Sequence, residues 1–310
     1  MSLTVRSEPH QQLTYADNVK MVAQQKRSKL RDTVTVAEAS GEAKSVADLV
    51  GSVEAQENTS RQRRNIENPP SLSRRWVVFP DELESGQYLD KEEKLQKAMD
   101  PTSVYVKTHT VAVERGIGDK ILGVKYVKKG DFELRDGGIL GAAVDGKTPG
   151  AAKIALPQKC YTAAAGSGLI LDKLLEGKER LNGDDFGLED DDEMHCAIGV
   201  KQVTNLLNMA RGNDENLNLL EQMALKTGTP TTLLGITWHV TNRLPLDANG
   251  DRMCPLWTKN NIVMGVWQDT LGQMWNDTSA KNTPYAHVGA FVDVVRAEDD
   301  GVHVFLCDES

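Results

Sequence analysis

The sequence predicts an α+β fold in which one long helix accompanies several shorter helices and strands. The long helix is indicated by apolar side chains that recur every three or four residues between Val106 and Val124. Strands are indicated by alternation of apolar and polar residues, as at 34–36 and 286–306. Hydrophobic residues make up 39% of the chain and aromatic residues 5%. We expect an extended protein with several small cores, although composition alone favours an ordinary soluble enzyme with a polar surface.

A long helix is predicted from Pro101 to about Lys125, a length of about 37 Å at 1.5 Å per residue. Asp100 can cap its start, and Pro101 fits the first turn without losing a needed donor. Gly130 is expected to close it as a C-terminal glycine. One apolar side of the helix is formed by Val106, Thr110, Val113, Ile117, Ile121 and Val124. Four charged side chains are expected to stay outside, namely Lys107, Glu114, Lys120 and Lys125.

Three glycines lie within this helix or near its end, at Gly116, Gly118 and Gly123. Each weakens a helix by about 1 kcal/mol relative to alanine, so tertiary contacts must hold it in place. The glycines allow either a close approach by a neighbouring segment or bending of the helix, and the sequence does not choose between these roles.

Charge and cysteine content exclude several classes of protein. The net charge of −9 argues against a general nucleic-acid binder, because phosphate affinity comes from many Lys and Arg contacts. The chain shows no signal peptide and no apolar window long enough to span a membrane, so we expect it to be cytosolic at synthesis. The widely spaced cysteines favour buried or free thiols over disulfides or a metal site: Cys160, Cys196, Cys254 and Cys307.

The first 80 residues predict a helix followed by a protruding β-hairpin loop. A short helix spans Tyr15 to Leu30, with Val19, Val22 and Met21 as candidates for its apolar side, and 31–36 then alternates as a strand does. A second short strand at 43–50 can pair back. Residues 57–73 are too polar to fold alone, and 74–79 (RRWVVF) resumes strand character until Pro80.

Opposite charges gather around the second arm of this loop. Its basic residues are Arg61, Arg63, Arg64, Arg74 and Arg75. The acidic run just beyond is Asp81, Glu82 and Glu84. A projecting basic arm in an acidic protein suggests contact with the acidic face of another copy. An exposed loop with arginines for solubility accounts for the same residues equally well.

The remaining chain alternates helices and strands. A charged helix is predicted at 90–99, and the glycine-rich stretch 131–157 predicts short strands and turns. Residues 168 to about 280 form a compact α/β unit with helices at 169–180, 201–210 and 216–227 and strands at 195–200, 233–240 and 261–267. The acidic loop 184–193 lacks the order of a calcium-binding EF-hand, so we expect it to be solvated.

The C-terminal residues predict a β-hairpin. Alternating apolar residues at 286–294 are followed by Asp299-Asp300-Gly301, and the alternation returns at 302–306. Such a hairpin needs a partner to cover its apolar side, and the long helix is the obvious candidate.

No catalytic, cofactor-binding or metal-binding residues are predicted. The histidines give no HExxH sequence and no metal-binding pair: His10, His109, His195, His239, His287 and His303. The sequence has no GxSxG, Walker or CxxC motif. His195 beside Cys196 suggests a cysteine hydrolase only weakly, because no glycine turn or oxyanion donor accompanies the pair.

The order of these parts, together with three stretches of sequence, resembles the major capsid proteins of tailed bacteriophages, above all the podovirus-type phage capsid proteins. The stretches are SRRWVVFPDELESGQYLDKEEKLQKAMDPTSVYVK at 73–107, QQKRSKLRDTVTV at 24–36, and the tail VHVFLCDES. In such proteins a strand flanked by arginines, a charged helix and a DPTS motif precede the spine helix. The resemblance spans nearly the whole chain and implies the Hong Kong 97-like, or Johnson, fold.

The resemblance also implies a division of the chain. Residues 1–29 would be an N-terminal arm and 30–89 an extended β-hairpin called the E-loop. Residues 90–166 would form the P-domain with its long spine helix and β-sheet, and 167–280 the α/β A-domain. Residues 281–310 would return to the P-domain as the closing hairpin.

The function implied is that of a coat protein without catalysis. Copies would self-assemble into hexamers and pentamers of an icosahedral phage head in the host cytoplasm. The head would enclose double-stranded DNA without sequence-specific binding, with a portal protein and in some phages scaffolding or decoration proteins as partners, and with no membrane. Covalent cross-linking through Lys44 is not expected. The alternative is an encapsulin-type shell of a cellular nanocompartment.

Overall fold

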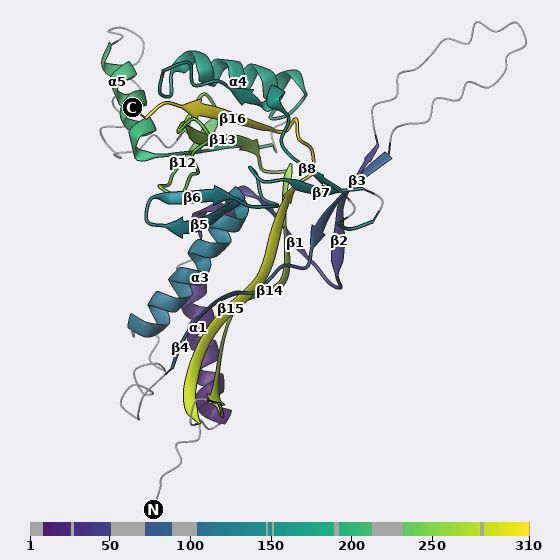
Figure 1. The fold of residues 1–310 in the computed structure, drawn as a ribbon, viewed down its shortest axis with the longest axis vertical. Helices are drawn as coiled ribbons and strands as arrows, with labels where there is room; N and C mark the ends of the chain where they lie inside the picture. Colours follow the sequence, from purple (N-terminus) through teal and green to yellow (C-terminus); the bar gives the residue numbers. More distant parts are fainter. Residues whose placement is uncertain are drawn as a thin grey trace, which may run out of the picture.

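The computed structural model describes residues 9–25, 28–50, 72–88, 104–146, 148–150, 152–188, 192–212, 232–279 and 282–309. They form a mixed α and β structure built on three larger sheets and a two-stranded ribbon. Figure 1 shows an α/β unit at one end of the molecule, a long curved pair of strands running away from it, and a hairpin at one side.

The curved pair consists of β14 (Ile262–Asp277) and β15 (Thr283–Arg296), the two longest strands among the described residues. They pair antiparallel from Ile262 opposite Arg296 to Asp277 opposite Thr283, with irregular register between 266 and 271. The sheet is completed by β1 (Thr35–Glu38), parallel to β14, and β4 (Leu83–Tyr88), antiparallel to β15.

Two helices pack on this long sheet. Helix α1 (Pro9–Gln25) packs on β14 through Tyr15, Val19 and Val22, all buried, while Met21 is exposed. Helix α3 (Val104–Leu122) lies against β15 and buries Val113, Ile117 and Ile121. The 3-10 turn η1 (Lys29–Thr33) joins the end of α1 to the start of β1 and also contacts α3.

The α/β unit contains a six-stranded sheet in the order β11-β12-β10-β13-β16-β9. Its strands are Thr232–Leu233, Ile236–Val240, Met194–Ile198, Arg252–Thr258, Val302–Cys307 and Tyr161–Thr162. Helix α4 (Leu171–Gly183) packs on β16, and α5 (Val200–Gly212) follows β10 directly. The short turn η2 (Gln158–Cys160) leads into β9.

The hairpin consists of β2 (Ala43–Val50) and β3 (Leu72–Val78), which pair antiparallel. Their sheet continues through β7 (Ala143–Asp145) to β8 (Ala152–Ile154), so β2 is an edge strand. A separate ribbon of β5 (Val124–Lys128) and β6 (Asp131–Leu134) follows α3. The returning arm predicted at 74–79 is confirmed as part of β3. The expected pairing of 43–50 with the strand at 31–36 is wrong, because β2 pairs with β3 as the outgoing arm and β1 joins the long sheet beside β14.

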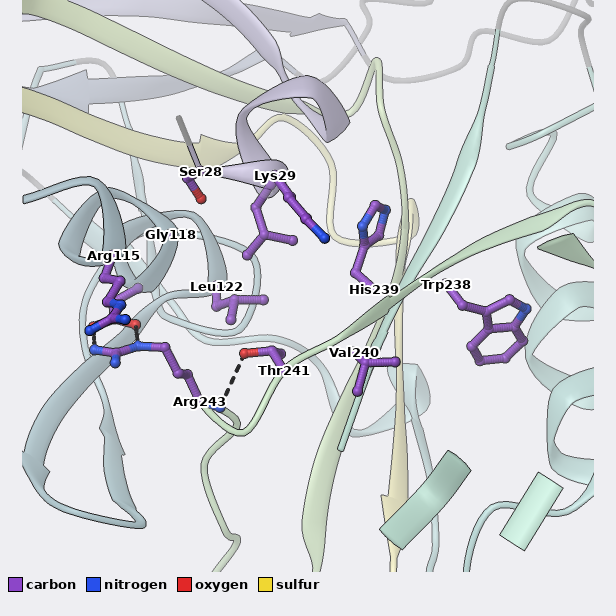
Figure 2. A pocket seen from close by; sticks show the side chains of 12 residues that line it. Ser28, Lys29, Arg115, Gly118, Leu122, Trp238, His239, Val240, Thr241 and Arg243 are labelled. Carbon is purple, nitrogen blue, oxygen red and sulfur yellow. Dashed lines mark hydrogen bonds and ion pairs between the residues drawn. The ribbon is translucent and has the colours of Figure 1, made fainter. Parts of the chain in front are cut away.

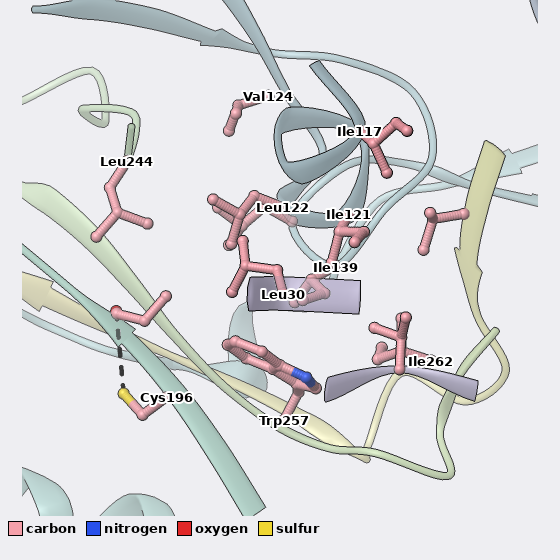
Figure 3. Close-up of a cluster of buried hydrophobic side chains, with 14 of the residues drawn as sticks. Leu30, Ile117, Ile121, Leu122, Val124, Ile139, Cys196, Leu244, Trp257 and Ile262 are labelled. Carbon is pink, nitrogen blue, oxygen red and sulfur yellow. Dashed lines mark hydrogen bonds between the residues drawn. The ribbon is translucent and has the colours of Figure 1, made fainter. Parts of the chain in front are cut away.

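One continuous core joins the long sheet, the helices and the α/β unit, which corrects the expectation of several small cores. Trp257 of β13 is fully buried and donates a hydrogen bond from its indole nitrogen to the carbonyl of Thr33 at 3.1 Å. Figure 3 shows it below Leu30, Leu122 and Ile121, so aliphatic side chains of η1 and α3 cover the ring. A second, small cluster of Val77, Ala143 and Val295 lies at the base of the hairpin.

The long helix is confirmed, but its predicted end is wrong. Helix α3 stops at Leu122, Gly123 adopts a left-handed φ of +77°, and the chain continues as β5. Gly130, which was expected to close the helix, turns the chain between β5 and β6. The predicted cap by Asp100 and Pro101 and the helices at 90–99 and 216–227 lie outside the described residues.

The predicted C-terminal hairpin is wrong in its pairing. Strands β15 and β16 belong to different sheets, because β15 pairs with β14 and β4 whereas β16 pairs with β13 and β9. The expectation that the long helix covers β15 is confirmed. Strand β13 was not predicted, although it is the central partner of both β10 and β16.

Two other boundaries differ from the sequence prediction. The alternation at 31–36 becomes a 3-10 turn followed by β1, because Leu30, Arg31 and Thr33 all turn inward. The stretch 233–240 breaks into β11 and β12 at Leu234 and Gly235, which both have positive φ.

Within the described part of the chain, no helix is long and apolar enough to cross a membrane.

The end of α3 provides a test of how closely the chain packs there. A Cβ at Gly123 would lie 2.6 Å from the carbonyl oxygen of Gly137 and 2.8 Å from the amide nitrogen of Gly141, whereas one at Gly130 would meet nothing within 4 Å. Both residues have positive φ. We expect Gly130→Ala to cost about 1–2 kcal/mol of unfolding free energy from the left-handed backbone. Gly123→Ala should cost about 1–3 kcal/mol more from overpacking.

Chemical denaturation of the unassembled chain measures both variants under one set of conditions. Equal losses of stability would contradict the close approach of 137–141 to the helix end.

Candidate functional site

A network of buried charges connects helix α3 to the N-terminal segment and to β14. Glu114 is only 2% exposed, and its carboxylate accepts hydrogen bonds from the backbone amide of Ser28 at 3.0 Å and the hydroxyl of Thr270 at 2.8 Å. The Nε atom of Arg31 lies 3.6 Å from Glu114, and the other guanidinium nitrogens donate to Asp269 at 2.5 and 3.1 Å. One carboxylate on α3 therefore joins η1 to the middle of β14.

Lys120, one turn and a half further along α3, fixes the helix to β15. Its ammonium group donates to the carbonyls of Val292 at 2.9 Å and Asp81 at 3.1 Å. Burial, and secondarily the nearby Arg135, lower the pKa of Lys120 to about 8, while Asp293 and Asp81 act in the opposite direction. The side chain thus stays largely protonated at neutral pH and can serve both carbonyls.

The expectation that Glu114 and Lys120 stay outside is wrong, because both side chains are buried. Glu114 lies four residues after Thr110 and three before Ile117, so its spacing places it on the apolar face. That spacing could have identified Glu114 from the sequence. The charge of Glu114 does not prevent its burial, because a carboxylate with three partners can be buried.

Asp119, a third charged residue of α3, connects the helix to the α/β unit. Arg243, which follows β12, donates from Nε and Nη2 to the two carboxylate oxygens of Asp119, both at 2.5 Å. The Arg243 guanidinium also lies over the ring of Phe132, 5.1 Å from its centroid. Both residues line a cavity of about 310 Å³ whose other walls include Lys29, His239 and Leu122. Figure 2 shows Arg243 at this cavity.

A separate cluster fixes the hairpin to the body. Arg75 of β3 is 4% exposed and lies 2.8 Å from Asp299, whose other carboxylate oxygen accepts a hydrogen bond from Arg296 Nε at 2.6 Å. Arg296 also donates to the carbonyls of Gly141 and Ile154. Two arginines from different strands thus share one carboxylate at the base of the hairpin.

The structure places the predicted inter-subunit residues in different settings. Arg61, Arg63 and Arg64 lie outside the described residues. Arg74 is exposed, and its guanidinium lies 5.5 Å from the ring centroid of Trp76. Asp81, Glu82 and Glu84 are also exposed. Arg75 already forms an ion pair with Asp299 of its own chain. Its contact with a neighbouring copy stays a prediction, and the ion pair with Asp299 argues against it.

The pair His195 and Cys196 is not arranged for nucleophilic catalysis. Cys196 is fully buried, and burial raises the pKa of its thiol well above the usual value. The imidazole of His195 lies on the other side of the strand, where its Nδ1 is 3.3 Å from Nε2 of His239. A buried thiol without a base is a poor nucleophile. The four cysteines are free and buried, as expected from their spacing.

Comparison with known proteins identifies the type of chain to which these features belong. A family model described as "Phage capsid protein" matches residues 8–309, almost the entire sequence. No curated protein is similar enough to count as a match.

Several solved structures have the same fold at low sequence identity. The capsid of Ralstonia phage GP4 superposes with a TM-score of 0.59 at 12% identity, covering 92% of this chain and 93% of that one. The capsid protein of cyanophage P-SCSP1u gives a TM-score of 0.55 at 15% identity, covering 92% and 89%. A virus-like particle from Pyrococcus furiosus gives 0.52 at 11% identity, covering 95% and 98%.

The Glu114 network predicts a large effect of a single truncation on α3. Glu114→Ala leaves the Ser28 amide and the Thr270 hydroxyl without their acceptor and leaves Arg31 with Asp269 as its carboxylate partner, and each buried group left unpaired costs about 1–3 kcal/mol. The neighbouring Arg115→Ala removes an exposed charge from the same helix and should change the unfolding free energy by less than about 0.5 kcal/mol. Urea denaturation of the unassembled chain compares them, and similar losses would contradict the network.

Buried histidines predict loss of stability in mild acid. Burial lowers the pKa of His195 to about 4, with His239 adding to the effect, and burial together with Arg180 lowers that of His303 to about 4. Between pH 6.5 and 4 the unfolded chain therefore binds more protons than the folded one, so stability falls as the pH falls through this window. Each histidine accounts for about 1–3 kcal/mol.

Thermal unfolding of the unassembled chain between pH 7.5 and 4.5 measures this loss. His303→Gln should reduce the pH dependence, since Gln cannot take up a proton there. An identical pH profile in the wild-type chain and the variant would show that His303 is not the group responsible.

Proposed function

The chain belongs to the phage capsid protein family and is a major capsid protein of the phage virion with a Hong Kong 97-like fold, and from that premise we propose how its copies build the head. Capsid proteins associate with copies of themselves. The proposal is that hexamers and pentamers of this one chain form a closed icosahedral shell around double-stranded DNA. Portal, scaffolding and decoration proteins are the further partners that the proposal allows.

The observation that carries this proposal is the extent of the family match, which covers residues 8–309. It includes the hairpin, α3, the long sheet and the α/β unit, so no part of the described chain is left over for a separate activity. The net charge of −9 fits a shell that encloses DNA without binding it tightly. An encapsulin-type shell shares the fold, and the virus-like particle from Pyrococcus furiosus is one similar structure, but the family model supports the phage coat.

The domain division is also a proposal, with two changes suggested by the sheets. Residues 1–29 serve as the N-terminal arm, 30–89 as the E-loop with β2 and β3, and 90–166 as the P-domain with α3 as its spine. The A-domain begins at 167. Its proposed end at 280 would include β14, which pairs along its length with β15, so we assign β14 to the P-domain. Strand β16 lies in the α/β sheet, so we assign it to the A-domain.

The hairpin is the element that we propose to reach a neighbouring copy. Strand β2 is an edge strand, and such edges present backbone groups that another chain can pair with. Arg74 and the acidic residues Asp81, Glu82 and Glu84 are exposed near its base. We propose that Arg74 and Asp81, with Arg61, Arg63 and Arg64, form ion pairs between copies, and that Glu82 and Glu84, which lie beside His287 in the same chain, add negative charge to that surface. Each exposed ion pair contributes only about 0–1 kcal/mol, but these contributions add because the contact is repeated around a closed shell.

The proposal of self-assembly is tested by expressing the full chain alone. Sedimentation velocity and negative-stain microscopy should show closed particles, together with free capsomers. A chain that stays monomeric under every assembly condition, and that is missing from virions, would contradict the proposal.

Charge reversal at the hairpin separates assembly from folding. Arg74→Glu should lower the yield of shells several-fold and change its salt dependence, while the unassembled chain loses only about 1 kcal/mol of stability, because Arg74 is exposed and its contact with the Trp76 ring is worth about 0.5–1 kcal/mol. Arg74→Lys keeps the charge and should restore most of the yield. Arg75→Glu should instead destabilise the isolated chain, because it would face Asp299 at the buried base of the hairpin.

Light scattering measures shell formation for the three variants, and chemical denaturation measures their folding. A normal yield and salt dependence for Arg74→Glu would exclude Arg74 from the contacts between copies.

A further inference from the structure

Three side chains that are distant in sequence converge on one face of the long sheet beside β4. His287 of β15 lies with its Nε2 atom 3.5 Å from Glu82 and 3.4 Å from Glu84. The three ligand atoms all lie within 4.8 Å of one another. No sequence motif marks this group, because Glu82 and Glu84 are about 200 positions away from His287.

Strand register explains why these side chains meet. In the antiparallel pair of β4 and β15, Gly86 lies opposite His287 and Glu84 lies opposite Gly289. Side chains two residues apart point to the same face of a sheet, so Glu84 and His287 are diagonal neighbours and Glu82 lies one step further on. Gly289 leaves the space that the Glu82 carboxylate enters. A Cβ there would collide with Glu82 Oε1 and lie 2.7 Å from Cε1 of His287.

The electrostatics of the group favour a hydrogen or a cation between its members. His287 is only 6% exposed, and its Nδ1 atom is buried with no hydrogen-bond partner among the described residues. If the neutral ring carries its hydrogen on Nδ1, the Nε2 lone pair faces two carboxylates and all three groups repel one another. Either a proton on Nε2 or a metal cation in the centre relieves this repulsion.

The distances favour the metal. A charge-assisted N–H···O hydrogen bond is about 2.7–2.9 Å long, well below the 3.4 and 3.5 Å observed. In a tetrahedral site with bonds of about 2.0–2.1 Å, neighbouring ligand atoms lie about 3.3–3.4 Å apart. The two distances from the imidazole nitrogen therefore match edges of a coordination tetrahedron better than a pair of hydrogen bonds, and the two carboxylate oxygens lie within 4.8 Å of each other.

We propose that Glu82, Glu84 and His287 bind a divalent transition-metal cation of the Zn²⁺ class that links β4 to β15. One imidazole and two carboxylates form a donor set that Zn²⁺ accepts with a fourth position left open. The side chain of Glu84 is 64% exposed, so the open position faces solvent and is filled by water. The site goes beyond the role of a coat protein, because it adds a metal-dependent clamp between the end of the hairpin segment and the long sheet.

The clamp holds the strand that leads out of the hairpin. Among the described strands, β4 has only one partner, β15, and it is the edge of the sheet. A cation held by both strands stabilises the folded state in proportion to its binding, because the ligands are not assembled in the unfolded chain. We therefore expect Zn²⁺ to raise the melting temperature of the chain.

The test uses the purified, unassembled full chain after treatment with EDTA. Isothermal titration with ZnCl₂ should give one bound ion per chain, and titration with Co²⁺ should give the visible absorption of a tetrahedral site. Glu84→Gln and Glu82→Gln keep the side-chain size and should weaken Zn²⁺ binding at least tenfold, since even the loss of outer partners costs 10- to 100-fold. Glu298→Gln is the matched control, because Glu298 is an exposed glutamate outside the cluster.

The three variants also separate the metal from the alternative of a protonated histidine. One equivalent of Zn²⁺ bound by the wild-type chain and by Glu298→Gln, but weakened in Glu82→Gln and Glu84→Gln, supports the site. Absence of Zn²⁺ binding, or equal binding by all four chains, overturns it. His287→Asn should abolish binding as well. If that variant fails to fold, the two glutamate variants still decide the outcome.

Discussion

The buried carboxylate of Glu114 is the interaction on which the rest of the structure depends. It lies on the apolar face of α3, where an unpaired charge would cost several kcal/mol. Its partners come from the segment before β1 and from β14, so the helix, the N-terminal segment and the long sheet must be assembled together for the charge to be satisfied. Lys120 and Asp119 extend the same constraint to β15 and to the α/β unit. Helix α3 is thus connected to each large part of the body through a different charged side chain.

This arrangement divides the molecule into two kinds of segment. The buried charges of the body have partners within the same chain, whereas the projecting hairpin remains available for contacts with other copies. The core around Trp257 is continuous from η1 to β13, so the body can fold as one chain before assembly. The hairpin differs, because it contacts the body mainly at its base, where Arg75 and Arg296 share Asp299. Beyond that base, β2 is an edge strand of its sheet within the described part of the chain. A coat protein needs both properties, since each copy must be folded before its projecting segments meet the next copy.

Local patterns in the sequence predicted local structure well and long-range pairing poorly. The three- and four-residue spacing of Thr110, Val113 and Ile117 identified α3, and RRWVVF identified β3, because both depend on neighbouring residues. The partner of β15 was wrong, since alternation in 302–306 marks a strand but not the sheet that it joins. Glu114 and Lys120 were predicted to stay outside because they are charged. The partners that allow their burial are distant in sequence, so no local pattern shows them. Glu82, Glu84 and His287 meet only through the register of β4 and β15, which no sequence motif records.

Electron cryomicroscopy of the particles formed by the full chain tests the account most directly. A map that resolves side chains should show the Glu114 network within each subunit, with Ser28, Arg31 and Thr270 of the same chain as its partners. It should also show the β2–β3 hairpin lying on an adjacent copy. Particles in which the hairpin contacts only its own subunit, or in which Glu114 is paired with a neighbouring copy, would contradict the division between a self-sufficient body and assembling arms.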